Sequence, residues 1–528
     1  MSQSLYSVSI YDTLGPDTTE YIINHASITI VVASLNHIPV LLKLKPRCPS
    51  LKVIISIDPI NAGEPAGYSK ADLLSQMAAG MDLKILQFTD VEAIGEKSSL
   101  SMNPPKAEDT VTINYTSGTT GNPKGVVLTH ANAVAASGSS LIACPQSSGG
   151  DQCGFSYLPL AHIYERNSEQ ATMAAGSKIA YFHGNPLEIV DDMKLCRPTG
   201  FISVPRIYNR FGGTVKATTT APGYSGAISR YIMNSKLSSL KNPDAPGATN
   251  KHALYDRIWG KPLMKTFGLD RARFMVSGSA PIDPSLHQLL RVAFPTHIIQ
   301  GYGLTETYAV SLVQLQGDLS AGNCGAVSPC VEMCLLDVPD MEYLSTDKPF
   351  PRGELLIRGP TVFKEYYKNP EETAKAFTSD GWFKSGDIAT VDALGRFKII
   401  DRRKNVLKLA QGEYVSPERI ENVYLANCPW LSAAYVHGDS HQSFLVMIGA
   451  VMPDAFAAFA GKVLGKSIGA TDYAAIMAAA KSERVRKEAL KVLGQVGKTS
   501  KFNSYERVRN LVLMLEPFTI DNELLTPT

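Results

Sequence analysis

A segment rich in hydroxyl side chains and glycine, Tyr115-Thr-Ser-Gly-Thr-Thr-Gly-Asn-Pro-Lys-Gly125, has the composition of a phosphate-binding loop. Glycine lets backbone N–H groups approach an anion closely, the Ser and Thr hydroxyls donate hydrogen bonds, and Lys124 supplies a positive charge. It is not a Walker A loop, because Pro123 and Val126 stand where that motif needs its second glycine. A flexible polar loop is the alternative interpretation, and phosphate binding is the favoured one.

A second polar segment, Gly301-Tyr-Gly-Leu-Thr-Glu-Thr307, directly follows an expected strand at residues 298–300. It is not a dinucleotide fingerprint, because Glu306 occupies the place of the third glycine. An aromatic ring, a hydroxyl and a carboxylate at a strand end can stack on a base, bind a phosphate and hold Mg²⁺. Taken alone, the segment fits an ordinary strand–helix turn equally well.

Asp387, at the end of Gly381-Trp-Phe-Lys-Ser-Gly-Asp387, and Arg402 are candidates for binding the two hydroxyls of a ribose. An isolated Asp or Arg is more often a surface charge, so each is weak evidence alone. Together with the two polar segments they describe a pocket for ATP, without residues for hydride transfer or for a kinase reaction.

These motifs resemble those of the adenylate-forming acyl-CoA synthetases. The resemblance rests on four segments in the same order and at the same intervals: YTSGTTGNPKGV, YGLTET, GWFKSGD and DRRKNVLKLAQGEYVSPERIE. The segments at residues 156–166, 203–209, 276–283 and 408–415 are similar to the long-chain fatty acid branch rather than to the coumarate or acetate branches. The match runs from about Tyr11 to the last residue.

The resemblance implies a role for each matching position. The β- and γ-phosphates of ATP would be bound by Thr116, Ser117, Gly118, Thr119, Thr120, Gly121 and Lys124. Tyr302 would stack on adenine, Thr305 would contact the α-phosphate, and Glu306 would hold Mg²⁺. Asp387 and Arg402 would bind ribose. The adenine and acyl pocket would be lined by Gly278, Ser279 and Ala280, and further nucleotide or CoA contacts would come from Gln300, Gly301, Gly303 and Lys408.

Two more residues are expected near moving or reacting parts. Lys404 would sit at the hinge, and His162 would lie near the passage for the acyl group and the thiol, although a structural role fits His162 nearly as well. The implied catalytic set is therefore Thr305, Glu306, Lys124 and His162. In the implied reaction a fatty acid carboxylate attacks the α-phosphate of ATP with Mg²⁺ bound, pyrophosphate leaves, and the thiolate of CoA then displaces AMP.

The printed sequence departs from the family's pattern at three points. The family carries a further stretch before the region of Tyr11, has Asp where Asn405 follows Lys404, and has a Lys soon after the segment that here ends at Thr528. From the last point we expect slow adenylation. Two alternatives therefore stay open. One is a nucleotide-binding protein, or an incomplete gene product, that keeps the fold but adenylates poorly. The other is an acyl-AMP ligase that loads a carrier-protein thiol.

The elements that must position these residues alternate along the chain. Short β-rich runs at residues 52–57, 83–88, 111–115, 273–276, 298–300 and 397–400 are separated by stretches of helical period. This pattern predicts a large α/β domain with partly parallel sheets over residues 1–401, followed by a small α+β domain over residues 402–528. The resemblance implies that this second domain is a mobile lid. In the second part Val485, Ala489, Val492 and Leu493 fall on one face of an expected helix. Residues 214–226 and 238–251 are expected to be loops around a short helix at residues 231–237.

Composition narrows the class of protein. Hydrophobic residues make up 44% of the 528 positions and charged residues 19%, which excludes a disordered or fibrous chain. The formal charge of +2 argues against a nucleic-acid binder. The spacing of Cys324, Cys330 and Cys334 fits no common zinc site. The first twenty residues do not read as a secretory signal. We therefore expect an intracellular protein, and the resemblance implies that it is either cytoplasmic or in peripheral contact with the endoplasmic reticulum, lipid droplets or peroxisomes.

Overall fold

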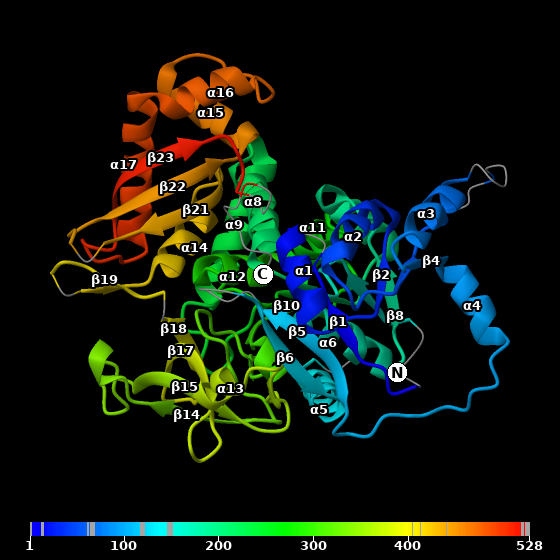
Figure 1. Cartoon of the computed structure of the whole chain (residues 1–528). Coiled ribbons are helices and arrows are strands. Elements are labelled where there is room, and N and C mark those ends of the chain that lie inside the picture. Colours follow the sequence, from blue (N-terminus) through cyan, green and yellow to red (C-terminus); the bar gives the residue numbers. More distant parts are fainter. Residues whose placement is uncertain are drawn as a thin grey trace. The chain divides into compact units, whose positions relative to one another are not determined.

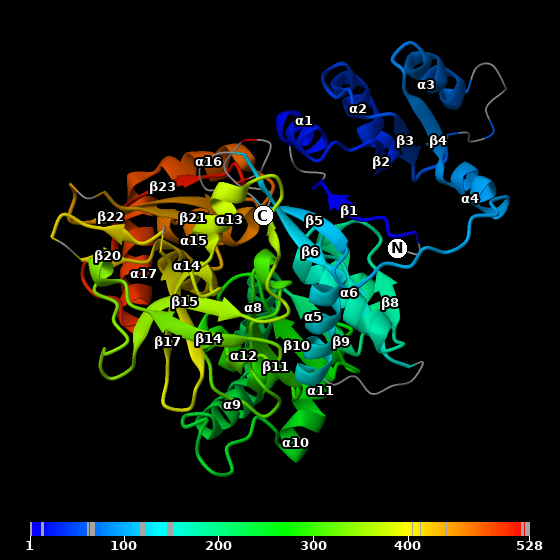
Figure 2. The same ribbon diagram turned by 60° about the horizontal axis from the view of Figure 1, so that its bottom comes forward.

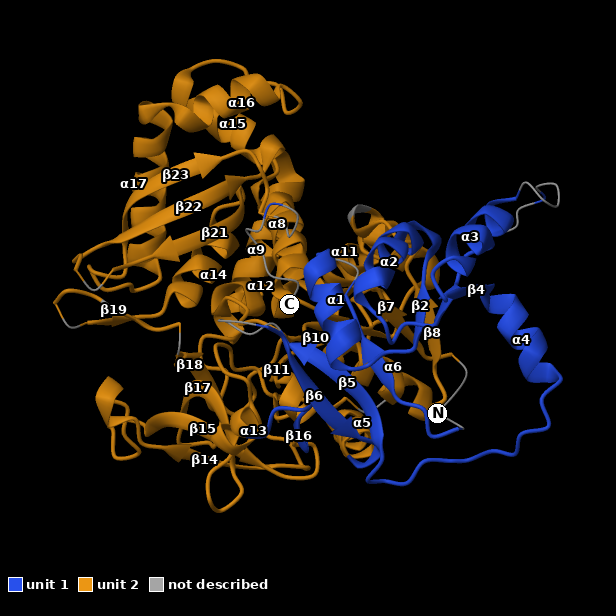
Figure 3. Ribbon diagram, in the orientation of Figure 1, with its two compact units in different colours: residues 1–131, 363–370, 519–528 blue, residues 132–362, 371–518 orange. Residues whose placement is uncertain are grey.

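The structure is a computed structural model that describes residues 3–11, 15–60, 63, 69–116, 122–144, 151–403, 405–411, 413–439, 441–518 and 522. The chain divides into two compact units, coloured separately in Figure 3. Unit 1 comprises residues 1–131, 363–370 and 519–528, and unit 2 comprises residues 132–362 and 371–518. The two units are described one after the other.

Unit 1 contains two sheets. The first has the order β1 (Ser7–Ser9), β5 (Thr110–Thr116), β6 (Lys124–Thr129) and β16 (Glu365–Tyr366). The second is parallel, with the order β2 (Ile30–Ala33), β3 (Val53–Ser56) and β4 (Lys84–Gln87). Four helices belong to this unit: α1 (Pro16–His25), α2 (Ile38–Leu44), α3 (Lys70–Ala79) and α4 (Phe88–Glu96). Leu41 and Leu42 of α2 pack with Ile54 and Ile85, so the parallel sheet has its own apolar core.

The central sheet of unit 2 carries most of the expected site. Its order is β13 (Ala326–Val327), β12 (Leu312–Val313), β11 (His297–Tyr302), β10 (Phe274–Ser277), β9 (Gly200–Ser203), β7 (Cys153–Ser156) and β8 (Lys178–Tyr181). The strands from β8 to β11 are parallel, β12 runs antiparallel to β11, and β13 runs antiparallel to β12. The carboxyl ends of the parallel strands β7, β9, β10 and β11 therefore lie at the same edge of the sheet, and the segments that follow these strands begin there.

Helices surround this sheet, as Figures 1 and 2 show. Their bounds are α5 (His130–Ala143), α6 (Ile163–Ala174), α7 (Ile189–Cys196), α8 (Pro205–Thr220), α9 (Gly223–Ser239), α10 (Ala253–Tyr255), α11 (Lys261–Thr266) and α12 (Pro284–Ala293). Phe211 of α8 and Leu290 of α12 join Phe201 and Met275 of the strands in one fully buried cluster. This burial holds the parallel strands in place, because it removes large apolar side chains from water.

A second, antiparallel sheet of unit 2 has the order β14 (Glu332–Leu336), β15 (Arg352–Arg358), β17 (Phe383–Val391) and β18 (Phe397–Arg402). Helix α13 (Pro370–Ala376) precedes β17. Register pairs Asp387 of β17 with Arg402 of β18, so the two ribose candidates face each other across neighbouring strands. The sequence predicted both residues but not this pairing.

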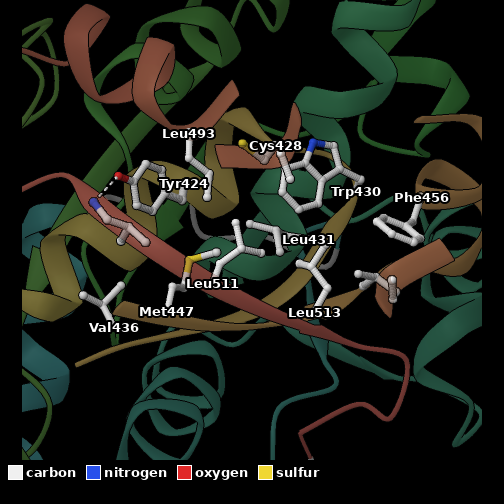
Figure 4. Packing of buried hydrophobic residues seen from close by; sticks show 14 of the residues in the cluster. Tyr424, Cys428, Trp430, Leu431, Val436, Met447, Phe456, Leu493, Leu511 and Leu513 are labelled. Atoms are coloured by element: carbon white, nitrogen blue, oxygen red, sulfur yellow. Dashed lines mark hydrogen bonds between the residues drawn. The ribbon is translucent and has the colours of Figure 1, made fainter. Parts of the chain in front are cut away.

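The last part of the chain has its own core, shown in Figure 4. Strands β21 (Leu431–His437), β22 (Leu445–Val451) and β23 (Val508–Met514) form a sheet, and the short strands β19 (Leu407–Lys408) and β20 (Tyr414–Val415) pair before it. Its helices are α14 (Pro417–Asn427), α15 (Pro453–Leu464), α16 (Tyr473–Lys481) and α17 (Glu483–Thr499). Tyr424, Trp430 and Leu493 are among the buried residues. The domain boundary at residues 401 and 402, and the mobility of this part, stay predictions.

The strands expected from the sequence are confirmed at all six positions, within one or two residues at their ends. Helix α17 is also confirmed, with Val485, Ala489 and Leu493 fully buried on one face. The loop expected over residues 214–226 is wrong, because α8 continues to Thr220 and α9 begins at Gly223. In α8 the side chains of Phe211, Val215 and Thr219 recur at helical spacing and are buried, and this packing overrides the loop-like composition. The loop expected over residues 238–251 is confirmed, since α9 ends at Ser239 and α10 begins at Ala253.

In the described part of the chain, no helix combines the length and the apolar character needed to cross a bilayer.

Candidate active site

The polar segment after β11 folds back on itself in a tight turn. The Ala309 N–H donates to the Leu304 carbonyl at 2.9 Å, and the Leu304 N–H donates to Oγ1 of Thr307 at 2.9 Å. A Cβ at Gly303 would lie 2.2 Å from the carbonyl oxygen of Ala309. Only glycine fits there, because no side chain can approach a backbone oxygen so closely. The turn presents Thr305 and Glu306 on a short 3-10 helix, Thr305–Thr307.

The turn is anchored by Tyr308, which the sequence analysis did not single out. Tyr308 and Ala309 both adopt positive φ values, 50° and 66°, which cost a non-glycine residue about 1 kcal/mol or more. Tyr308 is fully buried, and its hydroxyl donates to Oε1 of Gln170 on α6 at 3.0 Å. Burial and this hydrogen bond hold a strained backbone in place immediately after Glu306.

Tyr302 and Arg402, the last residues of β11 and β18, come together with Asp387 in the middle of β17. The Tyr302 hydroxyl donates to Oδ2 of Asp387 at 2.5 Å, and Nε of Arg402 lies 3.8 Å from Oδ1 of the same carboxylate. Asp387 is almost completely buried, and burial raises its pKa to about 6. The bond from Tyr302 and the charge of Arg402 lower that pKa, whereas the charges of Glu418 and Glu306 raise it. Glu306 therefore lies close enough to share the electrostatics of this site.

Gly278, Ser279 and Ala280 form the turn that leaves β10. Gly278 is buried, and a Cβ there would lie 2.8 Å from the ring of Tyr164 on α6. The Tyr164 hydroxyl donates to the carbonyl of Val276 at 3.3 Å, which fixes the ring against this turn. Ser279 has a φ of 72° and is exposed. The missing Cβ at Gly278 therefore lets the Tyr164 ring pack directly against this turn.

His162 precedes α6 and caps it. Its Nδ1 accepts a hydrogen bond from the Tyr164 N–H at 3.2 Å. Burial lowers the pKa of His162, so the ring is neutral at pH 7. Because Nδ1 is used as an acceptor, the neutral ring carries its proton on Nε2 in this arrangement. The structural role that the sequence analysis left open for His162 is therefore present.

Gln300 lies on β11 with its side chain buried. Its Nε2 donates to Sγ of Cys324 at 3.6 Å, and its Oε1 has no hydrogen-bond partner in the described part of the chain. A buried acceptor without a donor is costly, and a ligand that supplies an N–H or O–H would remove the cost. Gly301, Tyr302 and Gly303 follow Gln300 directly in the chain, and Tyr302 binds the Asp387 carboxylate, so these residues fit a nucleoside.

The remaining phosphate candidates belong to unit 1. Thr116 ends β5 and Lys124 begins β6, and the two residues pair in register with the Thr116 hydroxyl 3.5 Å from the Lys124 carbonyl. The segment therefore joins two antiparallel strands, and α5 begins only at His130, after the β-branched run of β6. The ammonium of Lys124 lies 5.1 Å from the centre of the Tyr366 ring.

Several predicted residues cannot be placed. Ser117, Gly118, Thr119, Thr120, Gly121 and Lys404 lie outside the described residues. Lys408 pairs with Tyr414 between β19 and β20. Within unit 2 the structure brings together Tyr302, Asp387, Arg402 and Glu306. The sequence missed Tyr308, Gln170 and Tyr164; the only signal for any of them was that Tyr164 lies within the segment at residues 156–166.

Comparisons with known proteins agree on one family. Residues 1–367 match the family described as AMP-binding enzyme. The chain is 58% identical over 529 residues to the peroxisomal acyl-CoA ligase 891 of Penicillium brevicompactum, covering 100% of this chain and 74% of that protein. It is 38% identical over 526 residues to the peroxisomal long chain acyl-CoA synthetase 7 of Arabidopsis thaliana, covering 99% of this chain and 72% of that protein.

A solved structure supports the same fold. The A domain of carboxylic acid reductase from Segniliparus rugosus, in complex with AMP and a co-purified carboxylic acid, superposes with a TM-score of 0.77 at 25% identity. The superposition covers 98% of this chain and 74% of that chain. The expected fold class, an adenylate-forming α/β architecture with partly parallel sheets, is confirmed.

Proposed function

The chain belongs to the AMP-binding enzymes and, within them, to the acyl-CoA ligases, and we propose that the turn after β11 and the carboxylate of Asp387 form its nucleotide site. The enzyme activates a fatty acid with ATP and transfers the acyl group to CoA. In the first step a carboxylate oxygen of the acid bonds to the α-phosphorus of ATP and pyrophosphate leaves. In the second step the sulfur of CoA bonds to the acyl carbon and AMP leaves.

The observation that carries the site is the bond between Tyr302 and Asp387. It fixes an aromatic ring beside a buried carboxylate that Arg402 also approaches. A nucleoside needs a face for its base and acceptors for its ribose hydroxyls, and this pair offers both. We assign Tyr302 to the adenine and Asp387 with Arg402 to the ribose. Gln300 and the Gly278–Ala280 turn supply the rest of the pocket.

Thr305 and Glu306 follow Tyr302 in the same turn, which supports assigning them to the triphosphate. We assign the Thr305 hydroxyl to the α-phosphate and Glu306 to Mg²⁺. When bound, Mg²⁺ neutralises charge on the phosphate oxygens. Thr116 and Lys124, with residues 117–121, are assigned to the β- and γ-phosphates, because hydroxyls and one ammonium in a glycine-rich loop match that anion. These groups act by holding the phosphates in line for displacement.

His162 is assigned to the passage shared by the acyl group and the thiol. A neutral imidazole is able to accept the proton of the CoA thiol before it attacks the adenylate. Its Nδ1 already accepts from the Tyr164 N–H, so taking a proton at Nε2 would require the tautomer with its proton on Nδ1, which gives up that bond. We therefore assign His162 first to positioning α6, and only second to proton transfer.

Lys404 stays assigned to the hinge, and Lys408 stays assigned to contacts made after the first step.

CoA is the favoured acceptor over a carrier-protein thiol. The relatives at 58% and 38% identity are an acyl-CoA ligase and a long chain acyl-CoA synthetase, whereas the carboxylic acid reductase domain is 25% identical. We propose a long-chain fatty acid as the substrate on the same ground. We also propose a peroxisomal location, because the two relatives are peroxisomal by name.

The deciding experiment separates the two half-reactions. The chain is incubated with ATP, Mg²⁺ and palmitate, with and without CoA, and the nucleotide and phosphate products are measured. We expect pyrophosphate in both cases, and AMP with palmitoyl-CoA when CoA is present. ADP and phosphate as products would overturn the nucleotide assignment. Turnover with a phosphopantetheine-bearing carrier protein but not with CoA would overturn the acceptor.

A further inference from the structure

Helix α9 in unit 2 packs on the protein through a mixed side, where Ile232 is buried together with polar residues, and it leaves an apolar stripe exposed on its other side. The side that packs on the protein carries Ser229, whose hydroxyl accepts from the Trp259 ring N–H at 3.1 Å, and Lys236, which pairs with Asp256 at 2.5 Å. The opposite side carries Tyr224, Ile228 and Tyr231, which are 90%, 55% and 66% exposed. A surface helix normally turns such residues inward. The exposed stripe of α9 therefore has a use outside the packing of unit 2.

The stripe continues onto the neighbouring helical segment. The ring of Tyr231 meets that of Tyr255 of α10 edge-on, with centroids 6.4 Å apart. Leu254 and Ile258, on either side of Tyr255 in the chain, are 57% and 53% exposed. Figure 2 shows α9 and α10 at the lower edge of that view. Scattered exposed apolar residues are normal, but a connected group of tyrosine, leucine and isoleucine marks an interaction surface.

The stretch of chain that carries this stripe is rich in basic residues. Between residues 223 and 266 the exposed basic residues are Arg230, Lys241, Lys251, Arg257, Lys261 and Lys265. The segment has two acidic residues: Asp256 is taken by Lys236, and Asp244 pairs with Arg396 at 2.6 Å. In the described part of the chain no carboxylate pairs with Lys251, Arg257 or Lys261. The local excess of positive charge contrasts with the near-neutral chain as a whole, at +2.

We propose that α9 and α10 form a docking surface for an anionic lipid bilayer, called here the α9–α10 face and consisting of Tyr224, Ile228, Tyr231, Leu254 and Ile258 with the basic residues around them. Tyrosine and aliphatic side chains enter the boundary between headgroups and acyl chains, while Lys and Arg remain with the phosphate headgroups. A second copy of this chain would have to place the same positive charge against itself, so charge complementarity favours the bilayer. The proposal rests on this surface and does not depend on the assignments of the nucleotide site.

The test measures co-sedimentation of the chain with phosphatidylcholine vesicles that do or do not contain 30% phosphatidylserine. We expect binding to the anionic vesicles only, and release by 0.5 M NaCl, because the attraction of surface charges is screened at that ionic strength. Each Lys or Arg near an anionic surface contributes about fivefold in affinity. The double variant Lys251→Glu and Arg257→Glu should therefore bind at least about twentyfold more weakly. The double variant Tyr224→Ser and Tyr231→Ser should also lose binding.

Matched controls come from α16, where Tyr473 is 57% exposed and Lys481 is exposed. The pair Tyr473→Ser and Lys481→Glu should bind as the unchanged chain does. All variants should keep turnover of a water-soluble acid such as octanoate, which shows that they fold and that the nucleotide site is intact. Failure of the unchanged chain to sediment with anionic vesicles would overturn the proposal. An equal loss of vesicle binding in the control pair would also overturn it. If the unchanged chain had twice the apparent mass of the tyrosine variant in solution, the α9–α10 face would instead be assigned to contact with a second copy of the chain.

Discussion

The hydroxyl of Tyr302 and the carboxylate of Asp387 are joined by a hydrogen bond of 2.5 Å across 85 positions of sequence. Tyr302 ends β11 of the central sheet, and Asp387 lies in the β14–β18 antiparallel sheet, so the bond links these two sheets of unit 2 at the candidate site. It also sets the charge of the site. Burial raises the pKa of Asp387 to about 6, and the bond from Tyr302 opposes that rise.

This pair predicts a pH dependence. Asp387 should lose its proton as the pH rises through about 6, and the carboxylate form is the one that accepts bonds from ribose hydroxyls. We expect kcat/KM for ATP to fall as the pH drops below 6, because that ratio reports ionisations of the free enzyme. In Tyr302→Phe the ring remains but the bond that lowers the pKa is lost, so the acid limb should move to higher pH.

The control for this profile is Tyr435→Phe, at a tyrosine that is 52% exposed on β21. Ionisation of ATP itself is common to all three proteins and cancels in the comparison. An acid limb at the same pH in Tyr302→Phe and the unchanged chain would contradict the coupling.

The Asp387 carboxyl group also makes the free energy of unfolding depend on pH. Its folded pKa is above the unfolded value of 3.8, so its contribution to the free energy of unfolding should fall as the pH rises from about 4 to 6.

Glu306→Gln tests the metal assignment. The substitution keeps the shape of the side chain and removes the charge that would hold Mg²⁺. We expect turnover to fall on the order of 10²-fold or more, as for loss of a group that acts on transition-state charge, and the Mg²⁺ concentration for half-maximal rate to rise. The melting temperature should change little, because Glu306 lies on a short turn rather than in a core. A rate equal to that of the unchanged chain, or to that of the exposed control Glu342→Gln, would exclude the role.

The hydrogen bond from Tyr308 to Gln170, next to Glu306, gives a separate prediction. Tyr308→Phe removes the bond to Gln170 and leaves the ring buried, so we expect a loss of about 1 kcal/mol in the free energy of unfolding. If the bond positions Thr305 and Glu306, kcat should fall by more than that loss of stability explains, with little change in the KM for the fatty acid. Gln170→Leu removes the same bond from α6 and should give the same fall. Full kcat in both variants would limit Tyr308 to a role in folding.

The sequence identified this site by the types of residues at strand ends. Residues 298–300 form a short β-rich run and are followed by a glycine-flanked tyrosine, so the turn after β11 and its chemistry could be predicted locally. The bond from Tyr308 to Gln170 could not, because 138 positions separate the two residues and nothing in either segment refers to the other. The register that sets Asp387 against Arg402 likewise depends on sheet pairing. The composition of residues 214–226 led to the wrong prediction of a loop, because burial of Val215 and Thr219 stabilises a helix among residues that favour loops.

Fatty acid chain length gives the last prediction, because it tests the substrate proposal without relying on the nucleotide site. A long-chain substrate must bury its tail, and each CH₂ removed from water contributes about 0.8 kcal/mol, or roughly fourfold in affinity. We therefore expect kcat/KM to rise by several-fold for each added methylene from octanoate upward, and to level off when the binding space is full. The measurement follows acyl-CoA formation at saturating ATP and CoA, with each acid kept below its critical micelle concentration. Acids that differ only in tail length share the same carboxylate chemistry, so the slope reports burial of the tail alone. A flat response from acetate to palmitate, or a preference for aromatic acids, would contradict a long-chain substrate while leaving the ATP and CoA chemistry in place.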